Sequence, residues 1–141
     1  MMEQLTAFVI HHPWLCGTFA VFLGLLLFTE TRKGGRRIGT GELVRLVNTQ
    51  SAQVIDLRSP ADFSRGTIAN AVNIPFSGVS SRLGELEKHK GLPVVLVDAM
   101  GQHAGAVSRQ LQSAGFDSVT CLSGGIASWT SENLPLVKLK T

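Results

Sequence analysis

The stretch PVVLVDAMGQHAGAVSRQLQSAG, residues 93–115, decides the fold. Four aliphatic residues after Pro93 are typical of a strand that is buried on both faces. A polar loop follows over 98–103, and apolar residues at helical spacing then predict a helix over about 104–114, with Gly115 as its C-cap. A buried strand that leads through a short loop into a helix is typical of a parallel sheet covered by helices.

Strand and helix signals continue on both sides of this stretch. Thr40 is the expected N-cap of a helix over 41–47, and Ser59 followed by Pro60 marks another helix start. The other expected elements are a buried strand over 52–57, a polar helix over 84–89, a strand over 119–122, a glycine turn at 124–125 and a helix over 126–132, which Trp129 packs against the core. This alternation predicts an α/β domain with a small, mostly parallel sheet flanked by helices.

Ligands of such sheets bind where the strands end. Ligand sites in parallel sheets lie at the carboxyl ends of the strands. The expected strands place 56–59 and 98–104 there, so these two segments are the first candidates for a functional site.

An uncharged apolar run precedes the domain. Over 7–28 it has 22 residues, enough for a helix to cross a hydrocarbon core of about 30 Å. The expected organisation is a short N-terminal tail over 1–6, one transmembrane helix over 7–29, a basic Gly-rich linker over 30–41 and the domain over 42–138. Two alternatives stay open, a buried core helix and a cleaved signal peptide. A domain of this size has little room for the first, and the second lacks basic residues before the run.

Four basic residues directly after the run, Arg32, Lys33, Arg36 and Arg37, set the expected topology. By the positive-inside rule they place the domain in the cytoplasm and the N-terminal tail outside. The same side chains are expected to contact membrane lipids. Cys16, Ala20 and Gly24 recur at intervals of four residues, which is a pattern that permits a helix-to-helix homodimer; small residues that face lipid are the simpler explanation.

Composition excludes several classes of protein. Charged residues make up 16% of the 141-residue chain and apolar residues 44%, which excludes a disordered chain. Two cysteines exclude a disulfide scaffold and a zinc site with four thiolate ligands. Most of the formal net charge of +3 comes from the bases beside the apolar run, so nothing indicates a nucleic-acid partner. No metal or cofactor is expected.

Ordered motifs in the domain resemble the rhodanese-like domain family. They are VIDLRSPADFSRGTIANAVNIP (54–75), VVLVDAMG (94–101) and LSGGIASWTSENLPL (122–136), which together span nearly the whole domain. Within this family, the chain is similar to single-pass, membrane-anchored bacterial members at the inner membrane. Three features carry this similarity: the apolar run, GELEKHK (84–90) and Asp98. The resemblance also implies that Asp56 and Arg58 stabilise the fold by ion pairing.

The resemblance implies a loop chemistry that this chain lacks. In active members a cysteine after the central strand takes a sulfane sulfur and passes it on, and the loop N–H groups stabilise its thiolate. The corresponding loop here is Asp98, Ala99, Met100, Gly101, Gln102, His103 and Ala104, so a carboxylate stands in the place of the cysteine. A carboxylate cannot carry sulfane sulfur.

Two roles for Asp98 stay open. It either accepts the N–H bonds of the loop and caps the following helix, or acts as a fixed anion that mimics a thiolate or contacts a basic ligand. Residues expected to contribute to any binding at this loop are Asp98, Gly101, His103, Arg58 and Gly124. The sequence therefore predicts a non-catalytic interaction or regulatory module with a protein partner at the membrane. The alternatives are sulfur transfer through Cys121, a carboxylate-based reaction at Asp98, and a lipid or anion sensor.

Overall fold

The computed structural model describes residues 1–32 and 35–138, and the chain divides into two compact units, 1–33 and 34–141. The first unit consists of the helices α1 (Met2–His11) and α2 (Pro13–Arg32). The second contains, in order, β1 (Arg36–Ile38), α3 (Thr40–Gln50), β2 (Gln53–Asp56), α4 (Pro60–Arg65), β3 (Val72–Asn73), the 3₁₀ turn η1 (Phe76–Gly78), α5 (Leu83–Leu86), η2 (Glu87–His89), β4 (Val94–Val97), α6 (Ala104–Ser113), β5 (Val119–Leu122) and α7 (Gly125–Ser131).

The N-terminal apolar run forms two helices, so the expected single continuous helix over 7–29 is not found. α1 and α2 meet at a bend of 97°. The bend falls at His12, whose φ of −129° and ψ of 55° are not helical. Pro13 explains it, because a proline lacks an N–H group and disfavours the helical conformation in the residue before it. Among the described residues no single helix has the length and apolar composition of a membrane span, whereas Met2–His11 and Pro13–Thr29 meet that test only as a bent pair.

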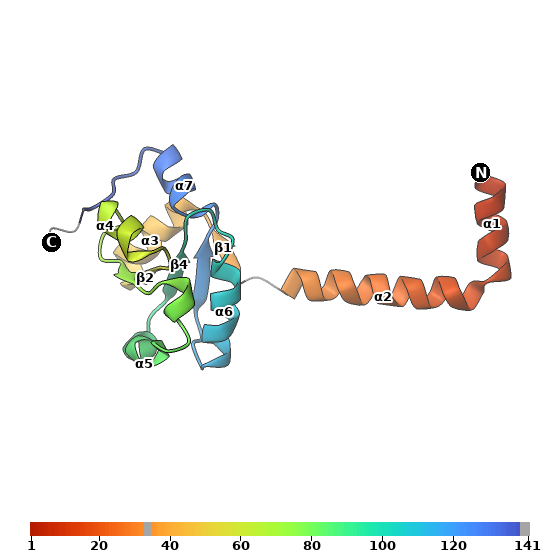
Figure 1. Ribbon diagram of the computed structural model, residues 1–141, viewed down its shortest axis with the longest axis horizontal. Coiled ribbons are helices and arrows are strands. Elements are labelled where there is room, and N and C mark those ends of the chain that lie inside the picture. The colour runs from red at the N-terminus through yellow and green to blue at the C-terminus, as the bar shows by residue number, and fades with distance from the viewer. Residues whose placement is uncertain (33–34, 139–141) are drawn as a thin grey trace. The chain divides into compact units, whose positions relative to one another are not determined.

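The domain is built on a five-stranded sheet with the order β1-β5-β4-β2-β3, and every neighbouring pair is parallel. Figure 1 shows the helices of the domain around this sheet. β4 lies at its centre, and its four residues are at most 1% exposed. β2 pairs with one edge of β4 and β5 with the other, so that Leu96 lies opposite both Ile55 and Cys121. This confirms the predicted strands over 93–97 and 119–122.

Alternate side chains of the strands pack on opposite faces of the sheet. On one face, Leu96 packs in a core cluster with Val107 and Leu111 of α6. On the other, Val95 belongs to a second cluster with helices α3 and α7. Trp129 of α7 is 6% exposed in this second cluster, which confirms its predicted place in the core. The domain therefore has three layers, with the sheet between two layers of helices.

Strand β1 corrects the expected linker over 30–41. Its three residues pair with β5, and Ile38 lies opposite Leu122. Ile38 is 5% exposed and packs in the same core cluster as Leu122. Without β1, the backbone N–H and C=O groups on this edge of β5 would have no strand partner. The folded domain thus includes a strand that precedes residue 42.

Helix starts follow the sequence in one case and differ in another. The Ser59 hydroxyl accepts the N–H of Asp62, and Pro60 is the first residue of α4, as predicted. Thr40 is not the N-cap of α3, because Gly39 holds that position. Thr40 is instead the first helical residue, and its hydroxyl donates to the Glu132 carboxylate. This long-range partner explains why a local capping rule misplaced it.

We expect Ile38→Ala to lower the free energy of unfolding by about 2–3 kcal/mol, because it removes buried side-chain volume at the sheet edge. The measurement is urea unfolding of the full chain, followed by Trp129 fluorescence in a Trp14→Phe background. Arg36→Ala, an exposed change on the same strand, is the matched control and should stay within about 0.5 kcal/mol of the parent. Equal, small effects of the two changes would show that residues 36–38 contribute no packed strand.

Candidate functional site

The loop after β4 folds around the carboxylate of Asp98. This residue is 3% exposed and stands where the strand ends. One carboxylate oxygen accepts the N–H of Gly101. The other accepts the N–H groups of His103, at 2.6 Å, and Ala104, at 3.3 Å. These are the contacts that a loop-holding, helix-capping role for Asp98 predicts. The same N–H donors are no longer free to hold another anion.

The first turn of α7 fixes the outer side of this loop. Its backbone donates from Ile126 to the carbonyl of Asp98 at 2.8 Å, and from Ala127 to that of Ala99 at 3.0 Å. At Gly125, with φ of +60°, an added Cβ would collide with the carbonyl oxygen of Asp98. The loop is therefore held from inside by a carboxylate and from outside by a helix terminus.

Two glycines of the expected site lie at the same contact. Gly101 has φ of +85°, and an added Cβ there would lie 3.1 Å from the backbone nitrogen of Gly124. Gly101 is buried, and Gly124 has φ of +73°. A cavity of about 520 Å³ lies beside this loop, and neither glycine lines it. Both serve the close packing of loop and turn, and of the five expected binding residues only Asp98, His103 and Arg58 line the cavity.

A buried ion pair between Arg58 and Asp56 fixes another part of the cavity lining. Arg58 donates from Nη2 to a carboxylate oxygen of Asp56 at 2.7 Å and to the carbonyl of Gly66 at 2.6 Å. The side chains of Arg58 and Asp56 are only 12% and 1% exposed. Thr67 adds a hydroxyl donor to the same carboxylate at 2.9 Å. This confirms the ion pairing expected for Asp56 and Arg58, and it fixes the start of the segment that leads into α4.

His103 and Phe76 close a third side. Their rings are in contact in a tilted arrangement, with centroids 4.8 Å apart and an interplanar angle of 33°. Between these walls lies the cavity of about 520 Å³. The residues that line it are Leu57, Arg58, Ser59, Pro60, Asp62, Pro75, Phe76, Ser77, Asp98, Ala99 and His103. The sequence reasoning missed Phe76, although its place directly after the motif that ends in Pro75 was a usable signal.

The cavity offers acid–base and ionic contacts but no nucleophilic sulfur. Cys121 lies on β5 with its side chain in the core under α6, is 3% exposed, and does not line the cavity. Burial raises the pKa of the Cys121 thiol, so the nucleophilic thiolate is disfavoured at neutral pH. In the described part of the chain, no group of three or more His, Cys, Asp or Glu side chains could hold a metal ion.

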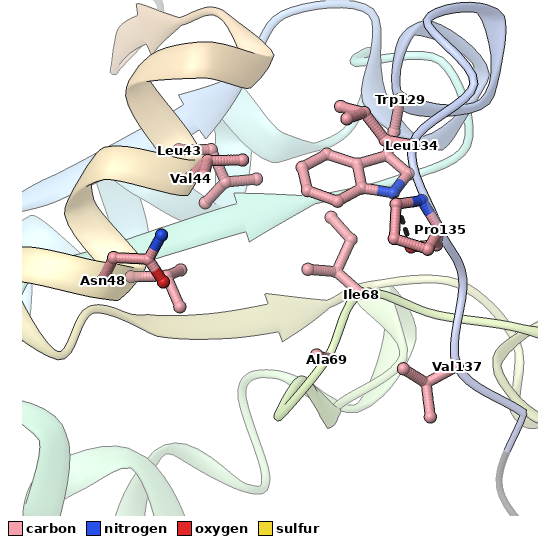
Figure 2. A pocket seen from close by; sticks show the side chains of 10 residues that line it. Leu43, Val44, Asn48, Ile68, Ala69, Trp129, Leu134, Pro135 and Val137 are labelled. Carbon is pink, nitrogen blue, oxygen red and sulfur yellow. Dashed lines mark hydrogen bonds between the residues drawn. The ribbon is translucent and has the colours of Figure 1, made fainter.

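A second, apolar cavity of about 360 Å³ lies on the α3 side of the domain. Figure 2 shows Leu43, Val44 and Asn48 of α3 on one side of it, Ile68 and Ala69 below, and Trp129, Leu134, Pro135 and Val137 on the other side. The Trp129 indole donates to the carbonyl of Pro135 at 3.0 Å, the bond drawn in Figure 2. Among the described residues, no titratable side chain lines this cavity, so these residues supply no group for proton or sulfur chemistry there.

A parallel sheet between two layers of helices, with a loop at the end of its central strand that curls around one side chain, is the architecture of a rhodanese-like domain. The family model for this domain matches residues 40–132, and the chain belongs to the rhodanese-like domain family. The chain is similar to the uncharacterized protein YibN of Escherichia coli (strain K12), with 38% identity over an alignment of 143 residues that covers 99% of this chain and 100% of the relative.

Two further relatives cover the domain. A protein of Allochromatium vinosum named sulfurtransferase is 30% identical over 93 residues, which cover 66% of this chain and 85% of that protein. The crystal structure of a rhodanese-related protein from Thermoplasma volcanium is 29% identical, with a TM-score of 0.66, and the match covers 72% of this chain and 97% of that one. The fold, as well as the sequence, therefore places the domain in this family.

The Cys121 thiol should react slowly in the folded protein, because it is buried and its pKa is raised. In a Cys16→Ser background at pH 8, we expect alkylation by iodoacetamide to be at least about tenfold slower than in urea-unfolded chain. Raising the pH should speed the reaction, since the raised pKa leaves the thiol protonated at neutral pH. A native rate equal to the unfolded rate would mean that Cys121 is accessible and would revive the sulfur-transfer alternative.

Proposed function

We propose that this chain is a non-catalytic rhodanese-like protein, whose domain presents a binding surface at the cytoplasmic face of a membrane. The observation that carries the proposal is the carboxylate of Asp98 in the loop. It takes the N–H groups of Gly101, His103 and Ala104, which would otherwise stabilise a thiolate or an anionic substrate. A carboxylate in that position can hold the loop but cannot accept sulfur.

The similarity to a protein named sulfurtransferase supports a shared fold. The loop of this chain argues against a shared activity. Sulfur transfer requires a thiolate that attacks the sulfane sulfur of a donor such as thiosulfate, so that the sulfur–sulfur bond breaks and sulfite leaves with the electron pair. Asp98 has no sulfur with which to do so. Cys121 is buried in the core and does not line the cavity, which argues against a replacement thiol.

The membrane part of the proposal rests on the N-terminal unit. α1 and α2 expose large apolar side chains along their length, among them Phe8, Trp14, Phe19 and Phe22. A helix pair with this exposed surface requires an apolar environment or a partner. Cations follow the pair: Arg36 and Arg37 belong to β1, whereas Lys33 and the side chain of Arg32 lie outside the described part of the structure. Their positive charge favours a cytoplasmic domain in contact with anionic lipids.

We expect the full-length protein to show no thiosulfate:cyanide sulfur transfer above a heat-treated control, because Asp98 cannot form a persulfide. Asp98→Cys should gain one sulfur atom by mass after exposure to thiosulfate, since its thiolate would meet the same N–H donors. Asp117→Cys, which places a thiol at an exposed loop, is the matched control and should gain much less. Clear sulfur transfer by the unaltered protein, especially if lost in Cys121→Ser, would contradict the proposal.

Membrane attachment should depend on the N-terminal helices. In cells that express the full chain, we expect the protein to stay with membranes after extraction at alkaline pH, and a chain that lacks residues 2–32 to be released, because the deletion removes the exposed apolar surface. The measurement is immunoblotting of membrane and supernatant fractions. Release of the full chain together with the truncated one would exclude an integral anchor.

A further inference from the structure

The cavity beside the loop carries one negative charge that has no cationic side chain as its partner. Among the described residues, three side chains with a formal charge line this cavity, Arg58, Asp62 and Asp98, together with the imidazole ring of His103. Arg58 is paired with Asp56 at 2.7 Å, and Asp62 with Arg65 at 3.2 Å. Within residues 1–32 and 35–138, the partners of the Asp98 carboxylate are backbone N–H groups and no ion pair is formed. The cavity is therefore complementary to a cation.

The hydrogen bonds of Asp98 leave room for a further donor. An ionised carboxylate offers about four lone-pair positions, and three backbone N–H groups use three of them. The oxygen bonded to Gly101 has one backbone donor, whereas the other oxygen has two. Because hydrogen bonds between ionised partners are stronger than neutral ones, a charged donor is the ligand that gains most at this position.

The other walls of the cavity fit the apolar stem of a long cationic side chain. Leu57, Pro60, Pro75 and Phe76 all contribute to its lining. Lysine and arginine side chains bury their methylene groups against such surfaces while the charged head reaches a polar group.

We propose that this cavity binds a lysine or arginine side chain that a partner protein presents, with its charged head toward Asp98 and its stem against Phe76. The inference rests on the proposed non-catalytic function, since a cysteine in place of Asp98 would make the loop a sulfur carrier. Among the described residues that line the cavity, Arg58 carries the guanidinium group, and it is ion-paired with Asp56 at 2.7 Å. Asp98 thus acts as the recognition element of the site.

The test uses n-butylguanidinium as the probe and n-butylurea, which has nearly the same shape without the charge, as its control. Each is titrated into full-length ¹⁵N-labelled protein in detergent micelles, and the backbone amide shifts of Gly101 and His103 are followed. We expect saturable shifts with n-butylguanidinium and at least about tenfold weaker binding of n-butylurea, because a charged hydrogen bond is lost.

Two variants separate Asp98 from general electrostatics. Asp98→Asn keeps the shape of the side chain and should remove the preference for the guanidinium probe. Asp117→Asn changes the net charge equally at an exposed loop that does not line the cavity, and it should leave binding within about twofold of the parent. Absence of shifts at the loop amides, equal binding of the two probes by the unaltered protein, or an unchanged preference in Asp98→Asn would each overturn the inference. The comparison of the two probes needs no variant, so it stands even if Asp98→Asn does not fold.

Sulfur transfer by the same preparations separates this inference from the proposed function. If neither guanidinium binding nor sulfur transfer is observed, the cation site is wrong and the non-catalytic function stands. If the unaltered protein transfers sulfur, the proposed function is wrong, and the cation inference that rests on it is overturned as well.

Discussion

Strand β4 must be paired along both edges and covered on both faces, and the rest of the domain follows from this requirement. Its residues are almost completely inaccessible, so their backbone groups have no access to water and need β2 and β5 as partners. Parallel neighbours require crossover connections, and the helices of those connections cover the two faces. Because all strands run the same way, β4 ends at the same edge of the sheet as β2, and the loops after them build the cavity between Arg58 and Asp98.

The residue at the end of β4 determines the chemistry available at this edge of the sheet. A loop with converging N–H groups is an electropositive cradle, and its chemistry depends on which anion occupies it. Here the anion is part of the chain. The carboxylate of Asp98 accepts the N–H groups of Gly101, His103 and Ala104, and Asp98 also lines the cavity. In this chain the residue that accepts these N–H groups is an aspartate.

Much of this could be predicted from the sequence, because the central elements have strong local signals. The aliphatic run of β4, the Ser59–Pro60 helix start and the loop from Asp98 to Ala104 were all placed correctly. What could not be predicted depends on distant partners. β1 has a single apolar residue, Ile38, and is a strand only because β5 offers it an open edge. Thr40 likewise bonds Glu132, at the far end of the domain sequence. The break at His12 had a local cause in Pro13, but the apolar composition of the run concealed it.

Strand β1 also determines where the chain can be cut without damage to the sheet of the domain. It is the first strand of the domain and begins four residues after the last residue of α2. A protease that cuts just before it would release a domain with its sheet intact, whereas a cut after Ile38 would leave β5 as a bare edge, open to pairing with another chain. The N-terminal boundary of the folded domain therefore has to lie before Arg36, and a fragment cut after Ile38 would be prone to aggregation.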